Sequence, residues 1–215
     1  MPLFKKNDLI LSLAIGILSA MMMIFVGRNL SAENAFFEIV VFYGDYILAL
    51  FPLFCVVWIT ATRFASKLVG ETICQFGKFI LTGGFNFLVD ATVLNFFIFS
   101  TGITDGIPQT GFKSVSFVFG VISSYALNRY WTFSVNLKKN ISKEILQFLA
   151  VSGIGFVVNV GADYFFVNMV GSFWDMRPSL WAQFSAVLAS AIAMIWNFTG
   201  YKFFVFKSKL DSVKL

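Results

Sequence analysis

The sequence predicts an all-α membrane protein with six transmembrane helices, and three observations lead to this fold class. First, 58% of the residues are hydrophobic and only 13% are charged, whereas soluble domains carry about 25% charged residues. Second, several apolar stretches reach the length of a transmembrane helix, about 18 residues or more. Third, the Lys and Arg residues gather in alternate loops, as they do when helices cross a membrane back and forth.

The first predicted span follows the basic residues Lys5 and Lys6, a pattern that signal peptides share. Its apolar run is longer than a usual signal core and no Ala-x-Ala site follows it, so we expect an uncleaved helix. A loop with Gly and Pro separates the third span from the fourth. The six expected spans are 9–26, 37–60, 79–99, 114–127, 145–170 and 180–198.

The basic residues predict that both termini are cytoplasmic. With the N-terminus inside, 13 of the 16 Lys and Arg residues fall on the inner side, as the positive-inside rule requires. Only Arg28, Lys113 and Arg177 then lie outside. The charges are divided among short loops, which argues against nucleic-acid binding and favours contact with anionic lipid headgroups. We therefore expect a multi-pass protein of the cytoplasmic membrane.

Residue types limit the chemistry. The chain has no His, which excludes His-based acid–base catalysis and His-containing metal sites. Cys55, in an apolar run, and Cys74, in a basic loop, are expected to be free thiols. Paired exposed carboxylates, a nucleotide loop and a nucleophile motif are missing, and the loops are too short for a sugar-nucleotide site. We expect neither enzymatic activity nor a cofactor or metal.

Two further sets of residues in or beside the spans have open roles. Asp45, inside the second span, is either a polar lining residue or a helix–helix contact. The aromatic residues at the span ends are expected to form an interfacial belt: Trp58, Tyr130, Trp131, Trp174, Trp181 and Tyr201.

An internal duplication organises the chain from residue 75 onward. The stretch 79–90 returns 69 residues later as 148–159, which places Asp90 on Asn159. Each copy has two spans, so both copies should share one orientation in the membrane. Small or polar residues recur every four positions in the fourth and sixth spans, where they let helices approach closely: Ser116, Gly120, Ser124 and Asn128, then Ser185, Ala189, Ala193 and Asn197.

A polar stripe marks each copy. Gly83, Asn86 and Asp90 share one helical face. An unpaired carboxylate in the middle of a span costs at least about 2.5–3.5 kcal/mol, so Asp90 must face the bundle, be protonated or find a partner. The matching stripe on the fifth span is Gly155, Asn159 and Asp163. Our hypothesis is that the two stripes face each other and line a polar crevice for a sugar; a structural network is the alternative.

This two-unit pattern resembles the GtrA-like family of small membrane proteins. The resemblance rests on Phe79 with Gly83, Gly84 and Asp90, on Asn-Arg-x-Trp-x-Phe at 128–133, on Phe148 with Gly153, Asn159 and Asp163, and on Asn197 with Lys202 and Phe206. It covers about residues 75–206, as a four-helix domain with repeats at 75–133 and 145–206. Family members typically have four spans, so residues 1–74 form an additional two-helix extension and residues 207–215 a basic tail.

The resemblance implies a role in cell-surface polysaccharide synthesis. Members of the family are thought to move, or help present, polyprenyl-phosphate-linked sugars across the cytoplasmic membrane, often beside a membrane glycosyltransferase. The same helical unit is also fused to polyprenyl-phosphate sugar synthases, where it serves as an anchor. We therefore expect a flippase or presenter of lipid-linked sugar. A non-transporting scaffold for a glycosyltransferase and a small-multidrug-type exporter are the alternatives, and a homodimer is left open.

Arg129 and Lys202 are expected at the inner boundary, one in each repeat, where both could hold a lipid phosphate. Lys202 stands where the family often has Arg, which weakens bidentate phosphate binding there. Plain anchoring at the membrane surface is the alternative role for both. The full set of predicted substrate-binding residues is Asn86, Asp90, Asn128, Arg129, Asn159, Asp163, Asn197 and Lys202.

Overall fold

The computed structural model describes residues 6–31, 35–135, 140–171 and 178–206, and all regular structure in these ranges is helical. The chain folds as two compact units, Met1–Ser134 and Val135–Leu215. The basic tail 207–215 lies outside the described residues. So do Trp174 and several of the basic residues that predicted the orientation: Lys5, Lys138, Lys139, Arg177, Lys207, Lys209 and Lys214. The orientation, the boundary at residue 75 and the duplication stay predictions.

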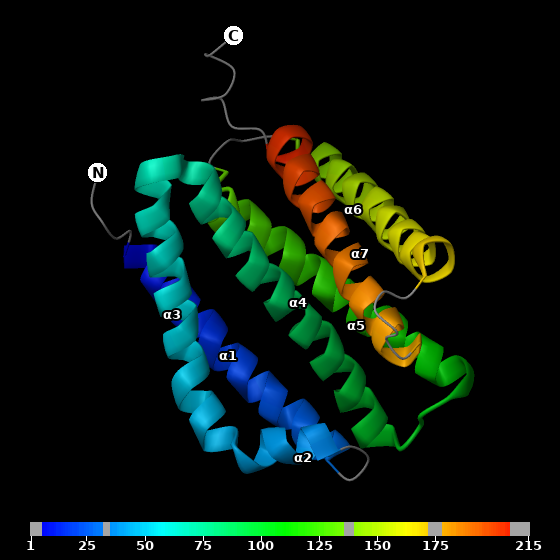
Figure 1. Ribbon diagram of the computed structural model, residues 1–215. Coiled ribbons are helices and arrows are strands. Elements are labelled where there is room, and N and C mark those ends of the chain that lie inside the picture. The colour runs from blue at the N-terminus through cyan, green and yellow to red at the C-terminus, as the bar shows by residue number, and fades with distance from the viewer. Residues whose placement is uncertain (1–5, 32–34, 136–139, 172–177, 207–215) are drawn as a thin grey trace. The chain divides into compact units, whose positions relative to one another are not determined.

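The first unit is a bundle around one long helix. Its elements in order are α1 (Lys6–Leu30), α2 (Ala35–Phe42), α3 (Gly44–Val69), α4 (Glu71–Thr101), α5 (Gly106–Leu127) and the π-helical turn η1 (Asn128–Thr132). The central helix α4 contacts α1, α3 and α5 (Figure 1). The predicted N-terminal extension is therefore packed directly onto the helix that carries the first polar stripe.

The second unit is a helical hairpin. Helix α6 (Ile141–Tyr164) continues into η2 (Phe165–Val170), and α7 (Pro178–Gly200) continues into η3 (Tyr201–Val205). The side chain of Asn140 caps α6 by accepting a hydrogen bond from the backbone N–H of Lys143 at 3.3 Å. The rings of Phe148 and Tyr201 stack with centroids 4.6 Å apart, which holds the open end of the hairpin together.

Glycines in unusual backbone conformations set the helix ends. Gly70, at φ 110°, separates α3 from α4. Gly102, in the left-handed region at φ 70°, ends α4, and its N–H donates to the Ile98 carbonyl at 2.7 Å. The predicted basic loop around Cys74 is wrong, because α4 runs through it, and α3 extends nine residues beyond the predicted end of the second span at residue 60. Cys55 and Cys74 are free, as expected, and both are buried.

Five of the described helical segments are long and apolar enough to cross a membrane: Asn7–Leu30, Gly44–Val69, Glu71–Thr101, Ile141–Val170 and Phe184–Val205. Helix α5 occupies the place of the predicted fourth span but is not among them. Its first half, 106–116, contains Gly, Gln, Thr, Lys and Ser residues, which lower its apolar character. The prediction of six spans is thus confirmed for five, and the chain is a multi-pass membrane protein.

Close helix contacts in the first unit depend on glycine. A Cβ atom built on Gly16 would lie 2.5 Å from Cα of Pro52, so α1 touches the backbone of α3. A Cβ on Gly77 would lie 2.6 Å from Cγ2 of Thr62, on α3. At the second contact the indole N–H of Trp58 donates to the Gly77 carbonyl at 3.0 Å. Gly77 therefore fixes how closely α3 approaches α4.

We predict that Gly77→Ala weakens the first unit and that Gly83→Ala does not. Both changes raise the helix propensity of α4 by about 1 kcal/mol. Only the first forces a methyl group into Thr62, whereas a Cβ on Gly83 meets nothing within 4 Å. Overpacking costs about 1–3 kcal/mol, so the unfolding free energy of Gly77→Ala in detergent should fall below that of Gly83→Ala by that amount. Equal values for the two variants would contradict the tight α3–α4 contact.

Candidate functional site

The Asp90 carboxylate is paired rather than isolated. Its Oδ2 lies 2.5 Å from Nζ of Lys113, and its Oδ1 accepts a hydrogen bond from the Ser116 hydroxyl at 2.5 Å. Both partners are on α5, Lys113 in a segment that was expected to be an outer loop. The side chains of Asp90 and Lys113 keep 24% and 49% of their surface exposed. The pair therefore has one accessible side.

Asn86 lies one turn from Asp90 on the same helix and also meets α5. Its Oδ1 accepts a hydrogen bond from the Ser123 hydroxyl at 2.8 Å. Gly120 lies between the two contacts, where a Cβ would be 3.6 Å from Cβ of Asp90. The first predicted stripe is thus a row of polar contacts between α4 and α5, which we call the α4–α5 polar row: Asn86, Asp90, Lys113, Ser116 and Ser123.

Asn128 and Arg129 are buried at the start of η1. The Asn128 amide donates to the Ser124 carbonyl at 2.9 Å, and its Oδ1 has no hydrogen-bond partner among the described residues. The Arg129 guanidinium donates to the Tyr125 hydroxyl at 3.2 Å and lies 5.4 Å from the centre of the Tyr130 ring. Binding of a lipid phosphate by Arg129 stays a prediction.

In the second unit the predicted residues are spread along the hairpin. The Asn159 amide donates to the Ser190 hydroxyl at 3.3 Å. Gly155 leaves room for Asn197, whose Oδ1 has no hydrogen-bond partner among the described residues. The same holds for Oδ1 of Asp163. Lys202 in η3 lies over the Phe203 ring, 5.6 Å from its centre. That this stripe and the α4–α5 polar row face each other stays a prediction.

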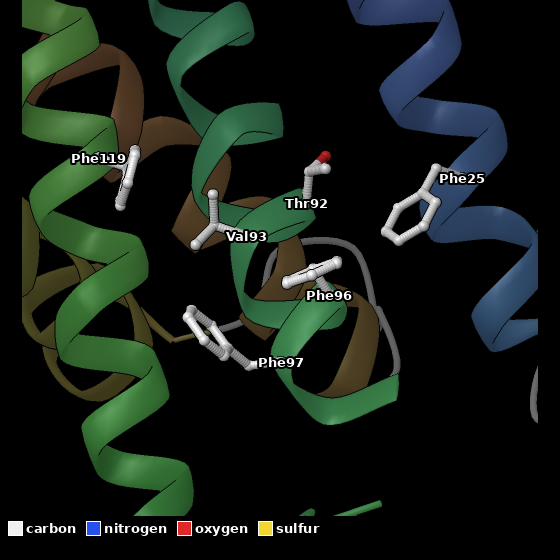
Figure 2. Close-up of a pocket in the computed structure, with 6 residues that line it drawn as sticks. All are labelled: Phe25, Thr92, Val93, Phe96, Phe97 and Phe119. Carbon is white, nitrogen blue, oxygen red and sulfur yellow. The ribbon is translucent and has the colours of Figure 1, made fainter. Parts of the chain in front are cut away.

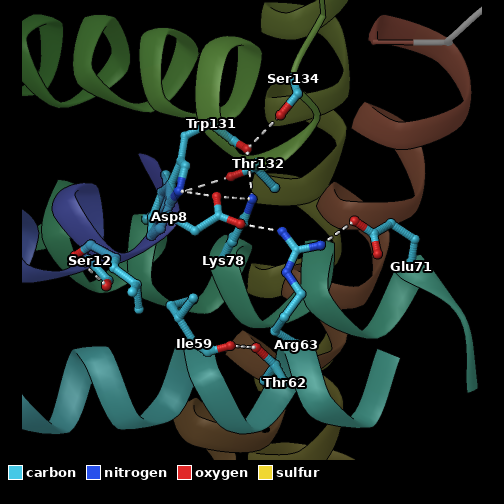
Figure 3. Close-up of polar contacts among 12 residues, drawn as sticks. Asp8, Ser12, Ile59, Thr62, Arg63, Glu71, Lys78, Trp131, Thr132 and Ser134 are labelled. Atoms are coloured by element: carbon cyan, nitrogen blue, oxygen red, sulfur yellow. Dashed lines mark hydrogen bonds and ion pairs between the residues drawn. The ribbon is translucent and has the colours of Figure 1, made fainter. Parts of the chain in front are cut away.

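A second polar centre, which the sequence did not indicate, lies where α4 begins (Figure 3). Oδ1 of Asp8, in α1, lies 2.6 Å from Nζ of Lys78 and accepts the indole N–H of Trp131 at 3.2 Å. The Arg63 guanidinium binds Oδ2 of Asp8 and, at 2.7 Å, Oε1 of Glu71. We call these five residues the Asp8 cluster. Two acids and two bases balance its charge, and it joins α1, α3, α4 and η1.

Three predicted members of the interfacial aromatic belt are buried instead. Trp131 is 2% exposed because it packs in the apolar core of the first unit, where its indole N–H also donates to Asp8. Trp181 donates to the Phe166 carbonyl at 3.1 Å, and Tyr201 shares a hydrogen bond of 2.6 Å with Ser152. Tyr130 is exposed, in agreement with the prediction. In each of the three buried residues, the polar group of the ring is hydrogen-bonded to the protein, rather than to water or lipid headgroups at the membrane surface.

An apolar pocket of about 400 Å³ lies on the first unit. Figure 2 shows the side chains that line it from α1, α4 and α5. They are Phe25, Thr92, Val93, Phe96, Phe97 and Phe119. Val93 is one turn from Asp90 on α4, so the pocket and the α4–α5 polar row are neighbours on one helix. The pocket suits a hydrocarbon chain of any kind.

The transmembrane-domain family described as GtrA/DPMS matches residues 78–206, more than half of the sequence. The chain belongs to this family. Its GtrA/DPMS domain contains all eight predicted substrate-binding residues, together with Lys78 and Trp131. Asp8, Arg63 and Glu71 lie outside it, so the Asp8 cluster joins the extension to the GtrA/DPMS domain.

A curated relative is also described as a membrane protein. The chain is 31% identical to the uncharacterized membrane protein YngA of Bacillus subtilis (strain 168) over 144 residues, which are 67% of this chain and 87% of that protein. No solved structure matches the sequence. The GtrA/DPMS family is associated with polysaccharide synthesis and glycosylation.

We predict that Asp8→Asn destabilises the protein far more than Glu71→Gln does. Each change removes one carboxylate from Arg63. Asp8 is buried and also serves Lys78, so its loss leaves two buried cations poorly compensated, at a cost of about 3–5 kcal/mol. Glu71 is 49% exposed, and such ion pairs contribute at most about 1 kcal/mol. Chemical unfolding in a mild detergent measures the difference, and comparable losses in the two variants would contradict it.

Proposed function

We propose that this protein moves or presents polyprenyl-phosphate-linked sugars across the cytoplasmic membrane, and that the α4–α5 polar row is part of the polar path. Membership of the GtrA/DPMS family supports the substrate class. The observation that carries the proposal is the Asp90–Lys113 ion pair, in which Asp90 lies within a candidate span and both side chains keep an accessible side.

The position of the pair makes that accessibility costly in lipid. Asp90 is 11 residues before the end of α4 at Thr101, or about 16 Å along the helix, and the hydrocarbon core is about 30 Å thick. Charged side chains at such depth are stable when they face a bundle interior or a water-filled cavity. A half-exposed Lys113 therefore favours a hydrated surface on this side of α4 and α5.

The groups in the row suit a sugar. Carboxylate and amide oxygens accept hydrogen bonds from sugar hydroxyls, and ammonium, amide and hydroxyl groups donate to them. Asp90, Asn86 and Lys113 supply both kinds of group within about two helical turns. The apolar pocket beside Val93 offers a place for part of the isoprenoid chain. The first unit therefore offers polar groups for the sugar and an apolar pocket for the lipid of an amphiphilic lipid-linked sugar.

We expect Asp90→Leu to lower transfer of a polyprenyl-phosphate sugar at least about tenfold, because loss of a specific hydrogen-bonded charge costs more than about 1.4 kcal/mol. Purified protein in liposomes is supplied with the lipid-linked sugar, and its appearance in the outer leaflet is measured. Asp105→Asn, which removes an exposed carboxylate at the start of α5, is the matched control. Normal transfer by a well-expressed Asp90→Leu variant would refute the proposed path.

A charge exchange separates a binding role from a structural one. In the double variant Asp90→Lys, Lys113→Asp the ion pair can re-form, so we expect more stability than in either single variant. Transfer should stay at least about fivefold below wild type, because the carboxylate has moved from α4 to α5. Thermal stability and transfer are measured on the same liposome samples. Full recovery of transfer along with stability would show that the pair only holds the helices together.

The same liposomes distinguish the alternatives. A scaffold for a membrane glycosyltransferase would give no transfer even in wild type, yet would raise the activity of the co-reconstituted transferase. A small-multidrug-type exporter would move a cationic dye across the membrane when a proton gradient is applied, and this transport would be lost with Asp90.

A further inference from the structure

The Asp8 carboxylate is held as a bound anion would be. Three donors converge on it: the Lys78 ammonium at 2.6 Å, the Trp131 indole N–H at 3.2 Å and the Arg63 guanidinium. All four side chains are buried. Ammonium, guanidinium and N–H groups are also the donors that bind phosphate oxygens most strongly.

Within the first unit, the part of the GtrA/DPMS domain at residues 78–134 has no acid that pairs with Lys78. Lys78 and Trp131 lie in the domain, and residues 78–134 contain two acids, Asp90 and Asp105. Asp90 is paired with Lys113. Asp105 immediately precedes α5, at the opposite end of α4 from Lys78. The acid that reaches Lys78 comes instead from α1 of the extension.

The balance of buried charge favours an added anion over an added cation. Lys78 and Arg63 are two buried cations, and Asp8 is the one buried carboxylate of the cluster. The remaining acid, Glu71, is half-exposed. Taking Asp8 away would leave a net positive, water-poor position with a cation–π contact from Lys78 to the Trp131 ring, 5.7 Å from its centre. Such a position binds an anion or loses stability.

We propose that Lys78, Arg63 and Trp131 form a phosphate-binding position, and that the carboxylate of Asp8 occupies it as a tethered substitute. A tethered group competes at an effective concentration of about millimolar or more, so in this chain α1 keeps the position closed to lipid phosphates. The extension is thereby an internal cover for one end of the GtrA/DPMS domain. The proposal concerns a different site from the α4–α5 polar row and does not depend on transport.

The test is anion rescue in two variants that remove the same charge. Asp8→Ala opens space for a phosphate group, whereas Asp8→Asn fills it with an amide of the same shape. Thermal unfolding is followed in neutral detergent with inorganic phosphate, with a polyprenyl monophosphate or with phosphatidylglycerol. We expect a phosphate probe to raise the melting temperature of Asp8→Ala by several degrees, with much smaller shifts for Asp8→Asn and wild type.

The arms identify the source of the anion and the residues that hold it. Rescue by inorganic phosphate alone indicates a free-ion position, and stronger rescue by either lipid indicates a headgroup position. The double variant Asp8→Ala, Lys78→Met should lose the rescue, whereas Asp8→Ala, Asp90→Leu should keep it, which separates this result from the outcome of the transfer assay. Equal shifts in Asp8→Ala, Asp8→Asn and wild type would overturn the proposal and leave a purely structural ion cluster.

A second variant covers the case in which Asp8→Ala does not fold. Asp8→Ser also removes the carboxylate and leaves room for an anion, and serine is well tolerated in the first turn of a helix, where Asp8 lies. A phosphate probe should raise its melting temperature by several degrees, as in Asp8→Ala. Glu38→Gln, which removes an exposed acid on α2 and leaves Asp8 in place, is the control and should shift no more than wild type does. If Asp8→Ser also shifts no more than wild type does, the proposal fails.

Discussion

A charge buried among membrane helices is stable when it meets an opposite charge, and the first unit is arranged around this requirement. The buried ammonium of Lys78 pairs with the carboxylate of Asp8, which lies near the N-terminus of the unit. This pairing brings α1 against α4 and places Trp131 of η1 over the same carboxylate. Arg63 then links α3 to the cluster. One carboxylate thus unites the added helices with the GtrA/DPMS domain.

The two polar centres of this unit differ in their access to the surroundings. In the Asp8 cluster the inner ion pairs are almost fully enclosed, so they contribute to specifying how the helices fit together. In the α4–α5 polar row the ion pair is partly open, which is costly in hydrocarbon and useful beside water or a sugar. This contrast is the reason for assigning substrate contact to Asp90 and Lys113, and a covering role to Asp8.

Local patterns in the sequence predicted much of this, and long-range contacts account for most of the errors. The apolar runs located five spans, and of the three alternatives for Asp90 (facing the bundle, being protonated or having a partner) the structure shows a partner, Lys113. The Asp8–Trp131 contact joins residues 123 positions apart, and no periodic pattern connects them. Trp131 was expected at the membrane surface because aromatic residues at span ends commonly form an interfacial belt. Helix ends were misplaced because Gly70 and Gly102, rather than hydropathy, determine where α4 begins and ends.

The length of α4 has a consequence for the surrounding bilayer. Its 31 residues extend over about 46 Å, against a hydrocarbon thickness of about 30 Å. Even at a steep inclination of about 40°, the helix still rises about 35 Å along the bilayer normal. Part of α4 therefore lies among the headgroups at any inclination up to about 40°. Its first two turns contain Glu71, Gln75 and Lys78, whereas the apolar run 79–99 alone extends over about 31 Å and matches the hydrocarbon core.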